Sequence, residues 1–462
     1  MIIHRVMVDV CAIILTFIRC LRFNFKVMKE DCMEKGFAEK GFEKGFIGLR
    51  FVVVLFLAVG MVSFGYGSAD ACSDGANFES AVAERAASER PDSVVAGSVI
   101  ADSVVADSVV AGSVIADTVV ADTVVADSVY AERVGRMALE RKIPVIQVAY
   151  KTPERSVVFE RAQYDFVKES EDVETVFQAA SISKVVFSYI VMRMVDRGEI
   201  DLDRPLHEYI GGLEERFLDA FPEDPELEGR NRAWAEQLTA RIVLTHGTGL
   251  PNWMTKGRHG EGKLIFKCEP DTDYTYSGEG IHYLQRVVEH ITGKSLEELA
   301  IKEVFEPFGM EHSSYRWKPE FDYLAADGYT AKVENGGKAS GNVDNAAFTL
   351  RTNVKDFSKF LDALMEGRGL TSETFNAMMT PYRKLDKEGM FFGLGIRVTP
   401  TASNYGRVWS HGGSNRNFRC KFWVFPDRKS YLIYFTNSAN GGGGTRKDLL
   451  EIFVPDYNRA DL

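Results

Sequence analysis

The stretch SISKVVFSYIVM, residues 181–192, places a hydroxyl and an amine at the start of an uncharged segment. On a helix, residues i and i+3 share a face, so the Lys184 amine can lie beside the Ser181 oxygen and help to remove its proton. The segment that follows is apolar nearly all round, which predicts a helix buried in a large domain. The alternative interpretation is an ordinary helix N-cap followed by a solvated lysine.

The size and charge of the chain limit the classes of function. Its 462 residues, 45% hydrophobic and 11% aromatic, can bury a substantial core, and such a length predicts one large catalytic unit with appendages. The net charge is -11, and the sequence has no cluster or stripe of Lys and Arg. We therefore expect no nucleic-acid partner.

Cysteines and histidines do not have the spacing of a metal site. Four of the six cysteines precede residue 73, and only Cys268 and Cys420 fall in the expected folded part. These two either form a bridge in an oxidising compartment or stay separate, partly buried thiols, and the second is the commoner arrangement. His282 and His290 are two helical turns apart without a carboxylate motif. We expect no metal and no cofactor.

Residues 51–69 carry no charge, follow Arg50 and lead into small residues, which is typical of an export signal. Cleavage after Ala71, lipid attachment at Cys72 and an uncleaved membrane anchor all fit the pattern. Each outcome puts the C-terminal domain in the periplasm or cell envelope. Residues 1–72 therefore form an N-terminal extension that offers membrane attachment, and a later start at Met28 or Met33 would shorten it.

Residues 73–131 are of low complexity, and a pentapeptide occurs eight times from Asp92 to Ala131. A period of five fits neither a strand nor a helix. We favour a spacer that holds the enzyme off a membrane over a small solenoid. The folded domain is then residues 132–462, and the sequence does not indicate its oligomeric state.

Strand patterns occur at both ends of this domain and helical patterns lie between them. A helix is expected at 131–142 and a strand at 143–150, and Ser295 with Glu298 forms a capping box in the centre. Later strands are expected at 393–398, 405–409, 418–425 and 431–437. This order predicts an α/β fold of the α+β type, with an antiparallel sheet built from both ends of the domain, flanking helices and an all-α subdomain.

Three motifs, taken in order, resemble those of the penicillin-recognising serine hydrolases. They are Ser181-x-x-Lys184, Tyr276-Ser277-Gly278 and His411-Gly412-Gly413. The likeness is greatest to class C β-lactamases, D-alanyl carboxypeptidases and β-lactamase-fold esterases, and it spans about residues 131–454. Three short sequence segments, at residues 198–205, 244–251 and 306–310, also support the resemblance. The resemblance implies a β-lactamase-like transpeptidase fold with its active site between the sheet and the all-α part.

The resemblance also implies the catalytic roles. Ser181 attacks an acyl carbonyl, Lys184 and Tyr276 share the acid–base work, and His411 belongs to the third catalytic motif. A lysine or a tyrosine is a poor base at neutral pH unless its surroundings shift its pKa, and two such neighbours titrate together. Either one can be the base. The backbone N–H groups of Ser181 and Ser414 would form the oxyanion hole.

The chain departs from the family pattern at positions that bind substrate. Gly278 stands where an asparagine is usual, and Glu279 and Asn342 are the candidate replacements. His411 replaces a lysine, and Gly412 supplies no hydroxyl for a substrate carboxylate. Gly412 and Gly413 instead let a substrate backbone approach the strand edge. Arg416 could offer positive charge there, although an arginine beside an exposed strand is more often simply solvated.

We therefore expect an exported serine hydrolase that forms an acyl-enzyme on a small molecule or short peptide. Esterase, D-aminopeptidase or carboxypeptidase, and β-lactamase activities all fit the motifs, and ester turnover fits the departures best. The rival is a non-catalytic, envelope-tethered binding module that retains the fold.

Overall fold

The computed structural model describes residues 127–170, 172–254, 262–385, 389–401 and 403–457. The chain divides into two units, Met1–Ser103 and Val104–Leu462, and every described residue belongs to the second. The expected export signal and all but the last pentapeptide copy lie outside the described residues. Within the described part, none of the helices combines the length and apolar character needed to cross a bilayer.

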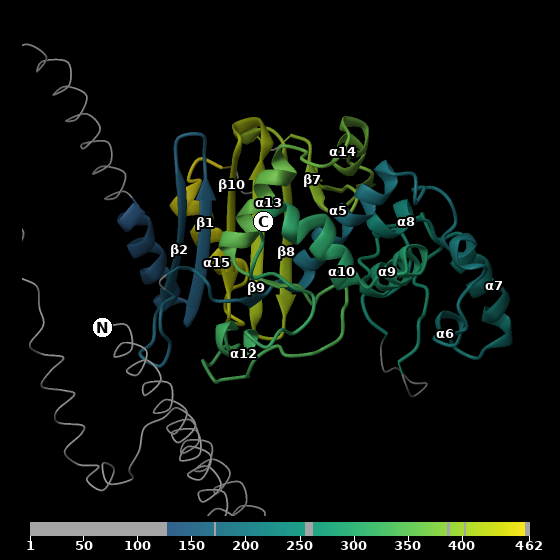
Figure 1. Cartoon of the computed structure of the whole chain (residues 1–462), viewed down its shortest axis with the longest axis horizontal. Coiled ribbons are helices and arrows are strands. Elements are labelled where there is room, and N and C mark those ends of the chain that lie inside the picture. Colours follow the sequence, from purple (N-terminus) through teal and green to yellow (C-terminus); the bar gives the residue numbers. More distant parts are fainter. Residues whose placement is uncertain (1–126, 171, 255–261, 386–388, 402, 458–462) are drawn as a thin grey trace, which may run out of the picture. The chain divides into compact units, whose positions relative to one another are not determined.

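One antiparallel sheet of eight strands organises this unit, in the order β2-β1-β10-β9-β8-β7-β6-β5. Its strands are β1 (Val145–Lys151), β2 (Ser156–Ala162), β5 (Arg383–Lys384), β6 (Phe391–Phe392), β7 (Arg397–Thr399), β8 (Val408–Asn415), β9 (Phe418–Phe425) and β10 (Ser430–Thr436). Strand β1 pairs with β10, so the first and last strands of the chain lie side by side in the sheet (Figure 1). The predicted sheet from both ends of the domain is confirmed.

The two faces of the sheet are covered by helices from different parts of the chain. In β10, Leu432 and Tyr434 pack with the helix over residues 127–140 and with α15 (Gly443–Phe453). The alternate residues Ile433 and Phe435 pack on the other face with α5 (Ser183–Asp196) and α13 (Val354–Met365). This alternation is the two-residue period of a strand buried on both sides. Helix α5 is buried nearly all round, as its apolar sequence predicts.

The middle of the chain forms the helical part seen at the right of Figure 1. Its main helices are α6 (Glu215–Leu218), α7 (Pro225–Glu236), α8 (Ala240–Leu244), α9 (Gly278–Thr292) and α10 (Leu296–Ala300). The predicted capping box is present, with Ser295 as the N-cap of α10 and Glu298 as its partner. Helix α9 buries the apolar stripe that contains Ile281 and Leu284. The predicted all-α region is therefore present beside the sheet.

Short elements complete the unit. They are β3 (Phe177–Gln178), η2 (Ala180–Ile182), η3 (Leu206–Ile210), η4 (Ile301–Phe305), α11 (Glu306–Phe308), α12 (Phe321–Leu324), β4 (Arg351–Thr352), α14 (Ser372–Met378), η5 (Ser403–Tyr405) and η6 (Pro426–Arg428). Strands β3 and β4 form a separate two-stranded sheet. Strand β3 lies directly before η2 in the chain and so leads into the Ser181 segment.

Several boundaries differ from the sequence expectation. The helix expected from Ala131 already includes residue 127, and Tyr130 stacks on Phe453 with ring centroids 4.8 Å apart. The last pentapeptide copy is thus part of a packed helix. The strand expected at 405–409 is instead β8, because pairing with β9 continues from Trp409 to Asn415 through the two glycines. Cys268 and Cys420 are both free thiols, so the bridge is not formed.

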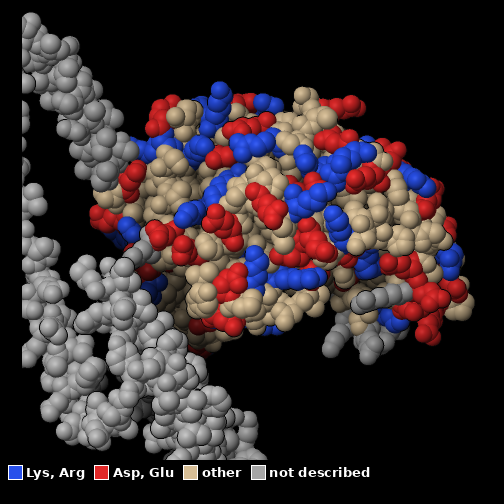
Figure 2. Space-filling model, viewed as in Figure 1, with Lys and Arg blue, Asp and Glu red and all other residues tan. Residues whose placement is uncertain are grey.

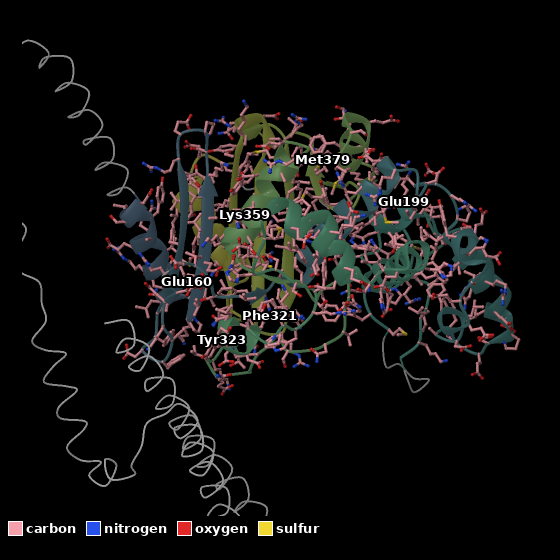
Figure 3. All side chains as sticks on the ribbon, in the orientation of Figure 1. Glu160, Glu199, Phe321, Tyr323, Lys359 and Met379 are labelled. Atoms are coloured by element: carbon pink, nitrogen blue, oxygen red, sulfur yellow. The ribbon has the colours of Figure 1, made fainter. Side chains whose placement is uncertain are left out.

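A buried carboxylate anchors the chain just before the Ser181 segment. Glu160, labelled in Figure 3, accepts hydrogen bonds from Gln147 Nε2 at 2.7 Å and from Thr175 Oγ1 at 3.0 Å. Gln147 Oε1 in turn accepts the Val354 N–H at 3.0 Å. Strands β1 and β2, the approach to β3 and the start of α13 are therefore tied together by the side chains of Glu160 and Gln147. On the face seen in Figure 2, the described acidic and basic side chains are interspersed.

Candidate active site

Ser181 lies in the short turn η2, two residues before α5 begins at Ser183, rather than inside the long helix. The preceding residue, Ala180, has φ = 47°, a left-handed conformation that costs a non-glycine residue about 1 to 2 kcal/mol. The surroundings hold this strained turn in place. Ser183 Oγ donates to the Ala180 carbonyl at 2.5 Å, and the Cys420 thiol donates to the Ala179 carbonyl at 3.1 Å. The turn leaves Ser181 partly exposed at the start of a rigid helix.

Lys184 is the buried amine of the site. Its side chain is only 1% exposed, and Nζ lies 3.3 Å from Ser181 Oγ. Burial lowers the pKa of Lys184 to about 7, and no opposing carboxylate contributes to this value. A large fraction of the amine is therefore neutral at physiological pH and can accept a proton. The alternative of a solvated lysine after a plain N-cap is wrong.

A backbone carbonyl fixes the direction of the amine. Lys184 Nζ donates to the Ala347 oxygen at 2.7 Å. The turn that presents this oxygen is itself held, because Asn345 Oδ1 accepts the Ala347 N–H at 2.9 Å and Gln285 Oε1 accepts the Ala346 N–H at 2.8 Å. Gln285 belongs to α9, so the helix that follows Tyr276 also positions the partner of the lysine.

Tyr276 completes the group around Ser181. Its ring centroid is 4.9 Å from Lys184 Nζ. Burial raises the pKa of Tyr276, and the nearby Ser181 only partly opposes this effect. The phenol therefore stays protonated at neutral pH. The structure brings the three side chains of the first two motifs together.

His246 clamps the segment that carries Tyr276. The His246 carbonyl accepts the Thr275 N–H at 2.7 Å, its ring Nδ1 accepts the Ser277 N–H at 3.2 Å, and its ring lies 4.2 Å from that of Tyr276. Burial lowers the pKa of His246 well below its usual value, with Lys184 adding to the effect. The ring is thus neutral, as an acceptor at Nδ1 must be.

His411 lies close to Tyr276, and the centroids of the two rings are 6.4 Å apart. It is 2% exposed, and Nδ1 lies 2.9 Å from the Gly412 carbonyl, which it can reach only as an N–H donor. Burial lowers the pKa of His411 well below its usual value, with Arg397 and Lys184 adding to the effect. The ring is neutral, and its Nε2 has no partner among the described residues. The role predicted for His411 in the chemistry stays a prediction.

The third motif lies inside β8 and touches the nucleophile turn. A Cβ added at Gly413 would overlap the Ala179 carbonyl oxygen and the Cys420 sulfur, so the absence of a side chain allows β8 to pack against η2. Gly412 faces the other side of the sheet, and a Cβ there would lie 3.5 Å from Arg446. Ser414 follows on β8 and is exposed. The predicted oxyanion donors thus belong to segments that are in contact.

Gly278 is the first residue of α9, and the space beside it is filled. A Cβ at this position would lie 2.7 Å from the Asn252 carbonyl oxygen and 2.8 Å from the indole of Trp253. The Gly278 N–H donates to Asn252 Oδ1 at 3.0 Å. A side chain at this position would force its neighbours to shift, and the Trp253 indole fills the space beside it.

Among the described residues, none of the remaining predicted ones is hydrogen-bonded to Lys184. Glu279 accepts the Met254 N–H at 3.0 Å. Asn342 is exposed in a loop. Arg416 is exposed at the tip of the β8–β9 hairpin with φ = 41°, and its carbonyl accepts a hydrogen bond from Arg419 at 2.6 Å. Neither Glu279 nor Asn342 replaces the missing amide.

Three features of the site were not predicted from the sequence. They are the Ala347 carbonyl, the clamp by His246 and the indole of Trp253. His246 lies in the segment 244–251 that supports the family resemblance, and this is the only signal for it in the sequence. The Ala347 carbonyl and the indole act through contacts between residues far apart in the chain, which no local motif marks.

Comparisons with known proteins place these observations in a family. A model of the family described as Beta-lactamase matches residues 123–454. Penicillin-binding protein 4 of Amycolatopsis lactamdurans is 30% identical over 151 residues, which are 30% of this chain and 36% of that protein. A D-aminopeptidase of Gluconobacter oxydans is 22% identical over 207 residues, 43% of this chain and 38% of that protein.

A lovastatin esterase of Penicillium rubens is 24% identical over 176 residues, 34% of this chain and 43% of that protein. The matches thus span well under half of the length of these relatives. A class C β-lactamase mutant has a similar structure, with a TM-score of 0.59 and 16% identity over 72% of this chain and 98% of that one.

A penicillin-binding protein homologue from Pyrococcus abyssi superimposes with a TM-score of 0.58 and 20% identity, over 74% of this chain and 79% of that one. These structures share the antiparallel sheet flanked by helices, and at such identities they show the fold alone. The family model, in contrast, spans the sheet, the helical part and all three motifs. The chain therefore belongs to the β-lactamase family.

Proposed function

We propose that this protein is a serine hydrolase that forms an acyl-enzyme on Ser181 and acts on esters in preference to amides or β-lactams. The observation that carries the proposal is the buried Lys184 amine, with a pKa of about 7, lying 3.3 Å from Ser181 Oγ. A base whose pKa is close to the working pH combines a useful neutral fraction with a useful proton affinity. Tyr276 stays a phenol, so the base in this proposal is Lys184.

The steps follow from the positions of these groups. Neutral Lys184 takes the Ser181 proton as Oγ attacks the acyl carbonyl, and the N–H groups of Ser181 and Ser414 bind the oxyanion. When the intermediate collapses, the phenol of Tyr276 gives its proton to the leaving alkoxide and regains one from the Lys184 ammonium. Water then attacks the acyl-enzyme, and the proton transfers through Tyr276 and Lys184 run in the reverse direction. The carboxylic acid is released and Ser181 regains its proton.

Two features favour esters. An amide substrate is usually held by polar side chains around its N–H and carbonyl, whereas here Gly278 and the indole of Trp253 occupy the position of an amide side chain. Gly412 brings no hydroxyl to the third motif. A site without those hydrogen-bond partners loses affinity for substrates that need them, because their polar groups would be buried unpaired. The esterase among the relatives is consistent with this choice.

The test is a panel of hydrolysis rates with purified protein. Short-chain aryl esters, D-amino-acid peptides and a chromogenic cephalosporin are compared by kcat/KM in the wild type and in Ser181→Ala. We expect the esters to give the highest kcat/KM and the activity to depend on Ser181. Faster cleavage of the cephalosporin than of any ester contradicts the substrate preference. No turnover of any substrate by folded protein favours the non-catalytic binding module.

We also propose that the hydrolase domain is exported and held at the cell envelope by its N-terminal segment. The support is the uncharged run at 51–69 followed by small residues and Cys72. Fractionation of cells that express the full chain, with detection of the hydrolase domain, tests the proposal. Recovery of the domain from the cytoplasm alone contradicts it.

A further inference from the structure

Two aromatic rings next to the active site are only partly covered by the protein. Trp253 is 39% exposed, and its ring meets the partly buried ring of Phe348 edge to face, with centroids 5.2 Å apart. Phe348 directly follows Ala347, whose carbonyl accepts the hydrogen bond from Lys184 Nζ at 2.7 Å. One member of the ring pair is therefore one residue away from the carbonyl that holds the catalytic amine.

The other member of the pair is held against the segment that carries Tyr276. The six-membered ring of Trp253 lies 2.8 Å from the place that a Cβ on Gly278 would take, and Gly278 is two residues after Tyr276. The Gly278 N–H donates to the carbonyl and to Oδ1 of Asn252, at 3.1 and 3.0 Å. These bonds hold the residue before Trp253 at the start of α9. The two rings thus link the segments that support Tyr276 and Lys184.

The indole and the glycine form one structural feature. A side chain at Gly278 would collide with the Trp253 ring, so the ring can lie there only because residue 278 is a glycine. A tryptophan offers a large apolar area and loses little conformational entropy when a ligand covers it. The chain therefore presents an apolar surface where a polar side chain would bind an amide.

The apolar surface continues beyond the two rings. Met254 is 42% exposed, and its N–H donates to Glu279 Oε1 at 3.0 Å, which holds this residue too against α9. A single exposed apolar side chain is ordinary on a protein surface, whereas several in contact mark a binding surface. Trp253, Met254 and Phe348 are contiguous and lie beside a reactive serine, which is the usual setting of a substrate site.

An apolar group on this surface also suits the chemistry of the site. Lys184 accepts a proton because burial keeps a large part of its amine neutral. Ser181 and Tyr276 are only partly buried, so water reaches this side of the site when it is empty. A substrate group that covers the rings would displace this water and keep the amine in apolar surroundings.

We propose that Trp253 and Phe348 bind an apolar chain or ring of the substrate, so that the preferred esters of this enzyme carry a large apolar group. The favourable free energy of such binding grows with the apolar area removed from water, and the methyl group of an acetate is too small to cover both rings. This inference rests on the proposed function, since it names the substrate class of the same site.

The test compares two series of neutral esters with purified full-length protein. The acyl series consists of the 4-nitrophenyl esters of acetic, butanoic and hexanoic acid. The alcohol series consists of the acetates of methanol, butanol and benzyl alcohol. We expect kcat/KM to rise by about 10- to 100-fold from the smallest to the largest member of one series. The series that shows the rise identifies the part of the ester that meets the rings.

Variants of Trp253 connect this rise to the indole. In Trp253→Ala, the ratio of kcat/KM between the largest and the smallest ester should fall to within about threefold of one. Trp253→Phe should retain part of the ratio, because it keeps an aromatic ring. The matched control is Tyr323→Ala, which removes an exposed aromatic side chain from α12 and should keep the full ratio.

Three results would overturn the inference. The first is a wild type whose kcat/KM does not rise with the size of the apolar group in either series. The second is a rise that survives in Trp253→Ala. The third is an equal fall in kcat/KM for small and large esters in Trp253→Ala, or a loss of the ratio in Tyr323→Ala as well, because either would show a structural effect.

Failure of the proposed function gives a different result. Hydrolysis that persists in Ser181→Ala, or no hydrolysis of any ester by the wild type, contradicts the acyl-enzyme and leaves the apolar surface to be judged by binding. Titration calorimetry with hexanamide and acetamide then decides. Binding of hexanamide about tenfold tighter than that of acetamide, lost in Trp253→Ala, supports the inference. Equal binding of the two amides, or a difference that survives in Trp253→Ala, overturns it.

Discussion

Replacing Lys184 with methionine should abolish acylation and yet stabilise the fold at neutral pH. The side chain is buried and has no carboxylate partner among the described residues, and burial lowers its pKa from 10.5 to about 7. Holding this amine in the folded protein at pH 7 therefore costs about 4 kcal/mol relative to the unfolded chain, where it is charged and solvated. Methionine has a similar unbranched shape and carries no such cost.

The gain from the substitution is smaller than this figure. Methionine leaves the Ala347 carbonyl without the donor that now lies 2.7 Å away, which costs about 1 to 3 kcal/mol. We expect a net stabilisation of about 1 to 3 kcal/mol at pH 7. Such a trade of stability for activity is common where a functional group is buried against its preference.

The pH dependence of this stability difference distinguishes the cost of burying the amine from an effect of side-chain repacking. Because the folded-state pKa of Lys184 is lowered, the unfolded chain binds more protons between about pH 7 and 10.5, and the stability of the wild type rises with pH in this window. The cost falls to about 1.5 kcal/mol at pH 9.5. The difference in stability between Lys184→Met and the wild type should therefore shift by about 3 kcal/mol toward the wild type between pH 7 and pH 9.5.

Urea unfolding at the two pH values measures these differences, provided that the slopes with denaturant agree. The control is Lys151→Met, whose ammonium pairs with Asp362 at the surface at 2.8 Å. This change should alter stability by less than about 1 kcal/mol at either pH. A difference for Lys184→Met that does not depend on pH, or a variant less stable than the wild type at both values, would refute the burial of a neutral amine.

Three further predictions concern the same site. The kcat/KM for a neutral ester should rise about tenfold per pH unit below about pH 7 and level off above it, as Lys184 loses its proton; a rise that begins only well above pH 7 would indicate a different base. Tyr276→Phe should keep this pH profile and lower kcat/KM by about 10²- to 10⁴-fold, and stopped assays on the folded variant check the size of the loss. Gly413→Ala should destabilise the protein by about 1 to 3 kcal/mol in thermal unfolding, because a methyl group there overlaps the turn before Ser181. Gly412→Ala should change the stability by less than about 0.5 kcal/mol. Equal effects of the two substitutions would contradict the packing of β8 on η2.

The elements that the sequence predicts well are those with a strong local signal. The apolar run after Lys184 becomes α5, the capping box at Ser295 opens α10, and the strand expected at Phe418–Phe425 becomes β9 with the same bounds. In each case the signal is contained in a short stretch of the chain. Local periodicity is the strongest signal that a single sequence contains.

The elements whose bounds differ from the sequence prediction depend on pairing with strands far away in the chain. Gly412 and Gly413 have low strand propensity, which favoured a turn at the strand end, yet hydrogen bonding to β9 carries them into β8. The same reason explains why the motifs placed Ser181, Lys184 and Tyr276 but not their supports. A motif marks the groups that react, whereas the Ala347 carbonyl acts only through the tertiary fold.

The central claim is that Ser181 is the nucleophile activated by Lys184, and covalent labelling tests it most directly. Folded protein is treated with a fluorophosphonate and with penicillin, and the adducts are mapped by mass spectrometry. We expect a single fluorophosphonate adduct on Ser181 that is absent from Ser181→Ala and forms much more slowly in Lys184→Met. Labelling of another residue, or labelling of Lys184→Met at the wild-type rate, would contradict the claim.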